Sequence, residues 1–184
     1  IVWPIQGPGD IRMLRDYPLK EGTAGEAKDH PHHRAMFIGH QGMNGANFWH
    51  NQHKNAGTVE HLKVIETRSG EDRALIQTLN AWKDSGGKII GADTRTLTFQ
   101  GDDHARILDL ELNMHATHED LIFEEFKDGF VGIRTHPDLR LTASPKYGVK
   151  KVYGKARNSE GGEGKGIWGK RADWVHYYGA IEGK

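Results

Sequence analysis

The chain contains no cysteine, and this absence removes several kinds of site at once. Disulfide bonds, zinc sites built on thiolates and cysteine nucleophiles all need a sulfhydryl group. An excess of either charge is also missing, because 25 Lys and Arg residues balance 25 Asp and Glu residues. A neutral chain has no summed field that draws it to nucleic acid or to anionic lipid. We therefore expect no nucleic-acid partner, and any partner has to be recognised locally.

Long apolar runs are absent too. The mean hydropathy is -0.70, and no stretch approaches the roughly 18 apolar residues that a membrane-spanning helix needs, so we expect no transmembrane segment. The opening residues, IVWPIQGPGD, lack the basic and apolar regions of a signal peptide, and the chain stops soon after a strand-like pattern. We expect a processed or trimmed chain that lacks strands at both ends.

Glycine, by contrast, is abundant, with 24 residues among 184, well above its usual share of about 7%. A chain that turns often uses glycine in this way, which favours many short strands. Residues 1–57 carry repeated turn signals and no sustained helical period, so we expect a loop-rich arm there. After residue 57, strand-length runs alternate with turn signals such as RSGED, DSGG and GDDH. Antiparallel hairpins follow naturally from this spacing.

The clearest alternation lies in the run ARILDLELNMHA. Leu108, Leu110, Leu112 and Met114 fall on one face of a strand, and polar residues fall on the other face. One side of this strand is expected to pack and the other to be wet.

The later runs LIFEEF, FVGIRTHP, DLRLTA and GIWGKRADWVHYYGAI also have the length of strands. We count eight or nine strands, no convincing helix and no internal repeat. The pattern predicts an all-β protein: one antiparallel β-sandwich domain over residues 1–184, with the loop-rich arm at 1–57 and the strands at 58–184.

The stretch NSEGGEGKGIWGK is rich in glycine but does not match a phosphate-binding loop. A Walker loop needs Ser or Thr after its Gly-Lys pair, whereas Lys165 is followed by Gly166. We interpret this stretch as a flexible hairpin loop.

Six of the twelve histidines lie between Lys28 and His53. Pro31 favours an extended backbone for the residue before it, so we expect His30 and His32 to point the same way and His33 to point the opposite way. This arrangement suits a metal with two cis ligands, a polar cleft that binds hydroxyl groups, or a structural loop. A third metal ligand has too many candidates to be informative: His40, His50, His53, His115 and His136.

A second informative segment is FVGIRTHP. Alternation places Val131 and Ile133 on one face and Arg134 and His136 on the other. A guanidinium beside an imidazole can clamp an anionic or hydroxyl-rich ligand, and a carboxylate such as Glu125 near an imidazole would form an acid and base pair. The alternative is a solvated strand face with surface ion pairs, which are common and weak.

The third informative segment is GIWGKRADWVHYYG, which mixes aromatic and basic residues. Aromatic faces stack on sugar rings or bases, and basic groups hold their oxygens. Alternation sets Trp174, His176 and Tyr178 on one face and Val175 and Tyr177 on the other, so we expect some of these rings to pack in the core.

Several of these segments carry a resemblance to a known family. The stretch from GPGDIRMLRDYPLK through DHPHHR to NGANFWH, together with RTHPDLRL, NSEG and WGKRADWVHYYG, resembles the PmoA-like family of bacterial proteins. That family shows a D-H-P-H-H-[RK] loop followed by an N-G-x-x-F-W element, and the likeness runs over nearly the whole chain in the same order. Its members are longer and often exported, so the resemblance implies a central portion and a periplasmic or secreted location.

The resemblance also bears on fold and activity. The family name derives from a subunit of methane monooxygenase, which implies a metal-dependent oxidoreductase. Related proteins resemble exported components of sugar catabolism, and an all-β chain with a polar sheet face is similar in outline to the galactose-mutarotase-like supersandwich. This last likeness is an analogy of fold.

The first functional hypothesis is a carbohydrate-processing enzyme or accessory protein that acts on a small sugar or glycan. It predicts a concave polar cleft, lined by His, Arg and Trp, where DHPHHR meets IRTHP. It needs no cofactor, although a metal ion is compatible with it. The expected catalytic residues are His32, His33, His136 and Glu125. The expected substrate-binding residues are His30, Arg34, His50, Lys127, Arg134, Trp168, Arg171 and Trp174.

Two alternatives remain open from the sequence. A metal-dependent oxidoreductase would bring His30 or His32 together with His136 or His50, so that three imidazole nitrogens converge within about 2.0 to 2.2 Å of copper, iron or zinc. A non-catalytic glycan-binding module would have the same cleft, but no carboxylate would reach an imidazole.

Overall fold

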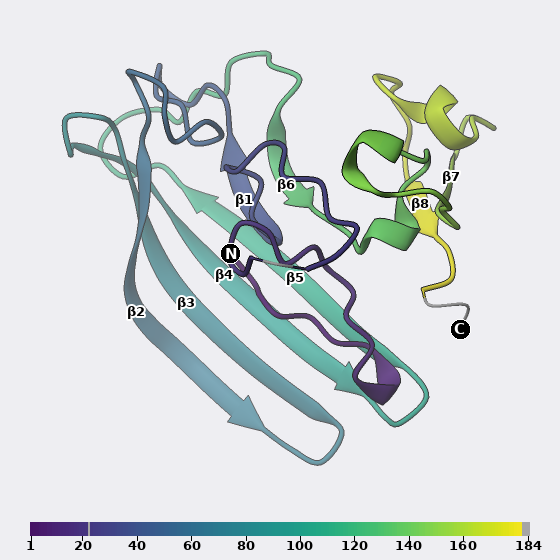
Figure 1. Cartoon of the computed structure of the whole chain (residues 1–184). Coiled ribbons are helices and arrows are strands. Elements are labelled where there is room, and N and C mark those ends of the chain that lie inside the picture. The colour runs from purple at the N-terminus through teal and green to yellow at the C-terminus, as the bar shows by residue number, and fades with distance from the viewer. Residues whose placement is uncertain (22, 182–184) are drawn as a thin grey trace. The chain divides into compact units, whose positions relative to one another are not determined.

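The computed structural model describes residues 1–21 and 23–181, and it is built from antiparallel strands (Figure 1). Strands and isolated bridges together make up 43% and helix only 7%, which confirms the prediction of an all-β protein. All helix within the described ranges is of the short 3-10 kind: η1 (Pro8–Asp10), η2 (Pro137–Leu139), η3 (Pro145–Tyr147) and η4 (Gly164–Ile167). None of the described helices has the length and apolar character to cross a membrane.

The largest sheet has four antiparallel strands that neighbour one another in chain order. They are β2 (Thr58–Ser69), β3 (Arg73–Lys83), β4 (Ile89–Gly101) and β5 (Arg106–His115). These strands coincide with the four runs that the sequence predicts. In β5 the burial alternates residue by residue, with Leu108, Leu110, Leu112 and Met114 half-buried and their neighbours exposed. The period of two therefore predicted the faces of this strand correctly.

A polar cluster is buried inside this sheet. Asp93 is 0% exposed, and its carboxylate accepts hydrogen bonds from Asn80 Nδ2 at 2.9 Å, Trp82 Nε1 at 2.7 Å and Arg95 Nη2 at 3.0 Å. Trp82 is itself fully buried and packs edge-on to the ring of Phe48. The Asp93 carboxylate holds its three donor side chains in place, because the loss of any one of them would leave part of a buried charge without a hydrogen bond.

Two further sheets have two strands each. β1 (Met36–His40) pairs with β6 (Gly129–Ile133), and β7 (Lys155–Asn158) pairs antiparallel with β8 (Val175–Tyr178). β1 lies inside the arm that the sequence predicts to be loop-rich, and four of its five residues are buried. A strand that is buried along its whole length has no alternation of apolar and polar residues, so β1 could not be predicted from that pattern.

Two of the predicted strands are wrong. The run DLRLTA does not form a strand, because Pro137 begins the 3-10 helix η2 and His136 caps it. The run LIFEEF contains only an isolated bridge at Phe123. The two faces of β6 also differ from those of a strand that packs its apolar side chains inward. Val131 and Ile133 are 44% and 54% exposed, whereas Arg134, which follows the strand, is half-buried.

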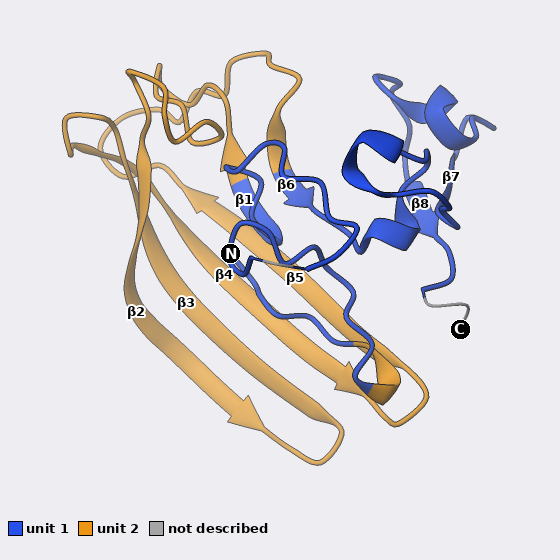
Figure 2. Ribbon diagram, in the orientation of Figure 1, with its two compact units in different colours: residues 1–6, 10–38, 131–184 blue, residues 7–9, 39–130 orange. Residues whose placement is uncertain are grey.

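The chain divides into two compact units (Figure 2). Unit 1 contains Ile1–Gln6, Asp10–Ile38 and Val131–Lys184, and unit 2 contains Gly7–Gly9 and Gly39–Phe130. The buried apolar residues of unit 1 are Leu14, Ala27, Ala35, Met36, Phe37, Leu139, Val149, Ala156 and Ile181. Those of unit 2 are Met43, Ala46, Ala81, Trp82 and Ile90. Unit 1 thus unites segments that are about a hundred residues apart in the sequence.

Candidate functional site

The site in unit 1 is built around two neighbouring arginines. Leu14 forms an antiparallel bridge with Thr135, and the backbone N–H of Arg15 donates to the carbonyl oxygen of Arg134 at 2.7 Å. The N-terminal segment therefore runs beside the end of β6. This pairing brings Arg15 and Arg134 together, although 118 positions separate them in the printed sequence.

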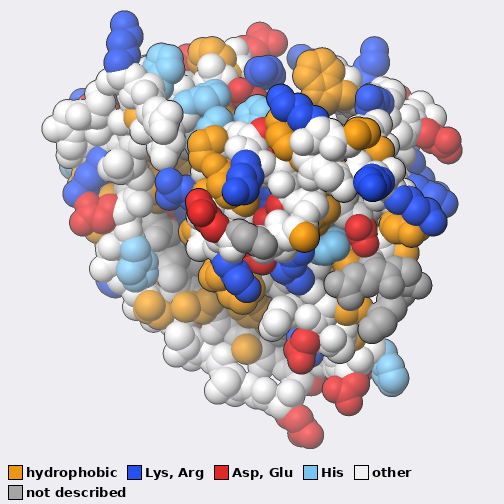
Figure 3. All heavy atoms as spheres, viewed as in Figure 1, with side chains coloured by type: hydrophobic (Ala, Val, Ile, Leu, Met, Phe, Trp, Pro, Cys, Tyr) orange, Lys and Arg blue, Asp and Glu red, His pale blue; other side chains and the backbone are white. Residues whose placement is uncertain are grey.

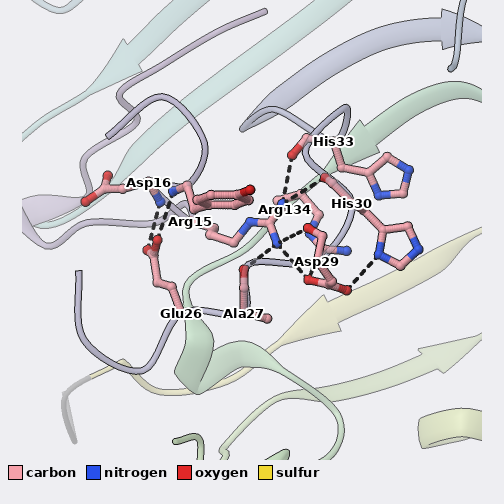
Figure 4. A network of polar contacts seen from close by, with 9 residues as sticks. Arg15, Asp16, Glu26, Ala27, Asp29, His30, His33 and Arg134 are labelled. Atoms are coloured by element: carbon pink, nitrogen blue, oxygen red, sulfur yellow. Dashed lines mark hydrogen bonds and ion pairs between the residues drawn. The ribbon is translucent and has the colours of Figure 1, made fainter. Parts of the chain in front are cut away.

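Arg15 organises the histidine-rich loop. Its side chain is buried, with 4% exposed, and its guanidinium donates to four backbone carbonyls (Figure 4). Nη1 donates to Ala27 at 2.8 Å and to Asp29 at 3.1 Å, and Nη2 donates to His30 at 3.3 Å and to His33 at 3.0 Å. Because one rigid fork binds four carbonyls, it holds the loop in a single shape.

The extended backbone predicted for His30 to His33 is wrong. His30 has a φ of 47°, and the N–H of His33 donates to the His30 carbonyl at 3.0 Å, so the chain turns at this point. The rings of His30 and His33 stack at 5.0 Å, and the ring of His32 stands edge-on to both. The physical reason is Arg15: a straight strand would point the carbonyls of His30 and His33 in opposite directions, away from a shared guanidinium.

Asp29 joins the two arginines to the imidazoles. Its Oδ1 accepts hydrogen bonds from Arg15 Nη1 and from Arg134 Nη2, both at 2.9 Å, and its Oδ2 accepts from His30 Nδ1 at 2.7 Å. Burial alone would raise the pKa of Asp29, but the His30 hydrogen bond and the charges of Arg134, His30 and Arg15 outweigh it and lower the pKa below 3.8. Asp29 is therefore ionised at neutral pH and balances part of the charge of the arginines.

Glu26 stabilises the segment that carries Arg15. It is 8% exposed, and its two carboxylate oxygens accept hydrogen bonds from the backbone N–H groups of Asp16 and Tyr17, each at 2.8 Å. It also pairs with Arg12, which lies 3.2 Å from Asp16 Oδ2. These contacts fix the backbone that follows Arg15 and the side chain of Arg12 that precedes it, so the guanidinium is positioned before any ligand arrives.

His33 carries the largest change of acidity in the site. Its pKa is lowered from 6.5 to about 4, chiefly by burial and to a smaller extent by the charges of His32, Arg134, His30 and Arg15. The ring also stacks on Phe37 at 5.4 Å. His33 is thus a neutral imidazole at pH 7, packed against apolar and aromatic neighbours.

A cavity of about 350 Å³ opens beside this network. Its polar walls are Arg15, Asp29, Arg134, Thr135, Arg140, Thr142, Lys165 and Tyr177. The cavity lies where the sequence placed a polar cleft, because Asp29 of DHPHHR and Arg134 of IRTHP both line it. Its lining differs from the prediction, however. Across residues 1–21 and 23–181, arginine, lysine and tyrosine line the cavity and histidine does not.

The expected stacking tryptophans do not line this cavity either. Trp168 is 80% exposed and Trp174 is 50% exposed. Tyr177, on β8, supplies the aromatic ring in their place. Burial raises the pKa of Tyr177 above 10, although a backbone hydrogen bond at Leu141 and the charge of Arg140 oppose the rise. The phenol is therefore protonated at neutral pH and can donate a hydrogen bond.

His136, expected to be catalytic, has a structural position. It is 7% exposed and forms the N-cap of η2, where its Nδ1 accepts a hydrogen bond from the Asp138 N–H at 3.2 Å. The Asp138 carboxylate lies 3.9 Å from the same nitrogen. Capping of this kind stabilises the turn that carries Arg140 toward the cavity wall.

The remaining expected residues divide between the two units. His30, His32 and His33 lie in unit 1 near Arg134, and Arg34 and Arg171 are exposed in the same unit. Three others belong to unit 2: His50, Glu125 and Lys127. The carboxylate hydrogen-bonded to an imidazole of the DHPHHR loop is Asp29 and not Glu125.

The sequence reasoning missed Arg15, Arg140, Lys165 and Tyr177 as members of the site. Arg15 lies in MLRDYP, where no period or spacing distinguishes it. The one signal that could have found it is its place within the stretch that resembles a known family. Lys165 was noticed only because it fails to complete a phosphate-binding loop.

Among residues 1–21 and 23–181, no group of three or more His, Asp or Glu side chains is arranged to hold a metal ion. The convergence of three imidazoles that a metal-dependent oxidoreductase would need is thus not found in the described part of the chain.

A family model matches residues 1–184 and is described as a family of unknown function, DUF6807. The chain belongs to this family. All segments that build the cavity therefore lie within the region that defines the family. Comparisons with curated proteins and with solved structures found no match. The likeness to PmoA-like proteins stays a prediction.

Proposed function

We propose that this protein binds a small carbohydrate derivative in the cavity of unit 1, as a carbohydrate-processing enzyme or as its accessory protein. The observation that carries the proposal is the wall of the cavity, which combines fixed hydrogen-bond donors with hydroxyl groups and one aromatic ring. Its volume of about 350 Å³ falls in the range of small-molecule sites, roughly 300–1,000 Å³.

The chemistry of the wall fits a ligand with many hydroxyl groups. The guanidiniums of Arg134 and Arg140 present donors in a fixed plane, and the hydroxyls of Thr135 and Thr142 both donate and accept. The ring of Tyr177 offers an apolar face for the C–H face of a sugar. The hydrogen bonds of Asp29 to Arg15 and Arg134 hold this part of the wall in place, so the binding of a ligand costs little conformational entropy there.

One contact supports an enzyme over a non-catalytic module. Asp29 Oδ2 accepts a hydrogen bond from His30 Nδ1 at 2.7 Å, so a carboxylate does reach an imidazole beside the cavity. Such a carboxylate fixes the tautomer and orientation of the ring and leaves its other nitrogen to take up or give a proton. This contact makes His30, rather than His32 or His33, the acid and base group of the proposal, and Asp29 is the residue that connects it to the cavity wall.

The proposal is tested by saturation-transfer NMR and calorimetry with a panel of hexoses, pentoses and their acids. Replacing Tyr177 by Ala should weaken binding by about two- to tenfold, because the stacking face is lost. The matched control is Tyr178→Ala, since Tyr178 is the next residue of β8, stacks on His176 and does not line the cavity. Equal loss in both variants, or no binding of any carbohydrate by the wild-type protein, would refute the proposal.

A further inference from the structure

The cavity of unit 1 has an imbalance of charge. Four of its lining residues are cationic, namely Arg15, Arg134, Arg140 and Lys165, and Asp29 is the one acidic residue among the described lining residues. One oxygen of Asp29 already accepts hydrogen bonds from both Arg15 and Arg134. The protein as a whole has no net charge, so this excess of positive charge is local.

Arg140 and Lys165 lack the compensation that Arg15 receives. Within the described residues, neither side chain takes part in an ion pair. Arg140 is half-buried at the end of η2, and Lys165 lies in η4. Arg134 and Arg140 line the same cavity. Burial lowers the pKa of Arg134, the attraction of Asp29 opposes this change, and the smaller repulsion from Arg140 adds to it.

We propose that Arg134, Arg140 and Lys165 form a subsite for an oxyanion of the bound carbohydrate, either a carboxylate or a phosphate. This inference rests on the proposed function and narrows the ligand class to sugar acids and sugar phosphates. An oxyanion placed between the two guanidiniums relieves their repulsion and receives charge-assisted hydrogen bonds from both. Lys165 adds a mobile point charge at the rim, where it can follow either kind of anion.

The segment that carries Lys165 is rich in positive charge, which favours the approach of an anion. Residues 146–171 contain eight basic residues, namely Lys146, Lys150, Lys151, Lys155, Arg157, Lys165, Lys170 and Arg171, against Glu160 and Glu163. Figure 3 shows several Lys and Arg side chains on the surface over the part of unit 1 that contains β7 and β8. A local field of one sign raises the concentration of the opposite ion and speeds its association.

The test is calorimetry at constant ionic strength and pH 7.5 with five probes: galacturonate, galactose, glucose 6-phosphate, glucose and inorganic phosphate. We expect at least one acidic sugar to bind about tenfold or more tightly than its neutral counterpart. Arg140→Gln should remove this preference, and Lys165→Gln should reduce it. The matched control is Arg157→Gln, because Arg157 is an exposed guanidinium of unit 1 on β7 that does not line the cavity.

The outcomes separate this inference from the proposed function. Equal affinity for acidic and neutral sugars overturns the oxyanion subsite and leaves the carbohydrate cavity standing. Binding of inorganic phosphate alone, lost in Arg140→Gln, supports the subsite and overturns the carbohydrate. No binding of any probe overturns both. If Arg140→Gln fails to fold by circular dichroism, the exposed Lys165→Gln decides, and an unchanged acid preference in that variant overturns the subsite.

Discussion

The neutral imidazole of His33 should make the stability of the protein depend on pH. The pKa of His33 in the folded protein is about 4, against 6.5 for the ordinary side chain. In the unfolded chain the ring therefore takes up a proton first as the pH falls. The contribution to stability is complete above pH 6.5, is lost progressively between pH 6.5 and pH 4, and changes no further below pH 4.

The size of this loss follows from the two pKa values. Integration of proton binding from pH 7.5 to pH 5, with 6.5 and 4 as the two values, gives a loss of about 2 kcal/mol. Because the ring is half-buried and part of the effect comes from neighbouring charges that solvent screens, we expect about 1 to 2 kcal/mol in practice.

The assay compares wild type with His33→Phe, which keeps a ring against Phe37 but cannot take up a proton. Free energies of unfolding in urea, followed by tryptophan fluorescence, should fall more steeply for wild type than for the variant between pH 7.5 and pH 5. The control is His104→Phe in the exposed β4–β5 connection, which should retain the pH dependence of wild type. If wild type and His33→Phe lose the same stability over this range, the burial argument is wrong.

Two further predictions concern packing. Asp93→Asn should lower the free energy of unfolding by about 2 to 4 kcal/mol, because an amide cannot accept all the hydrogen bonds of the buried carboxylate and leaves the Arg95 cation without its counter-charge. The control is Asp109→Asn at an exposed position of β5. Equal melting temperatures for the two variants would contradict this account. Gly154→Ala should cost about 1 to 3 kcal/mol and weaken ligand binding in unit 1, since a Cβ there would overlap the carbonyl of Leu139 beside η2. Gly166→Ala, which meets nothing within 4 Å, should leave the melting curve unchanged.

The sequence predicted the regular part of the fold well. The hairpins from β2 to β5 follow from alternating residues and glycine-containing turns, because both signals are local. It failed where a few distant contacts decide the conformation. The turn at His30 depends on the Arg15 guanidinium, and β1 depends on burial along its length, and neither leaves a period in the chain.

The place of the site could be predicted in outline but its lining could not. The segments DHPHHR and IRTHP do meet, as their mixture of charged and imidazole groups indicated, through the Asp29 and Arg134 pair. The roles predicted for the histidines of those segments are wrong, however. Histidine is a common catalytic residue, but its burial cannot be read from a sequence. His136 caps a helix and His33 packs on Phe37, and the cavity wall went to arginines instead.

The contrast between two arginines shows what separates support from function in this unit. Arg15 is almost completely buried, and its two terminal nitrogens donate to four carbonyls and a carboxylate within the fold. Arg140 lines the same cavity, is half-buried, and has no ion pair among the described residues. A buried guanidinium whose terminal nitrogens are bound within the fold adds rigidity, whereas one that faces a cavity without a counter-charge gains most when a ligand supplies it. The two residues are the same in the sequence, and only their contacts distinguish Arg15, which holds the loop, from Arg140, which lines the cavity without an ion pair among the described residues.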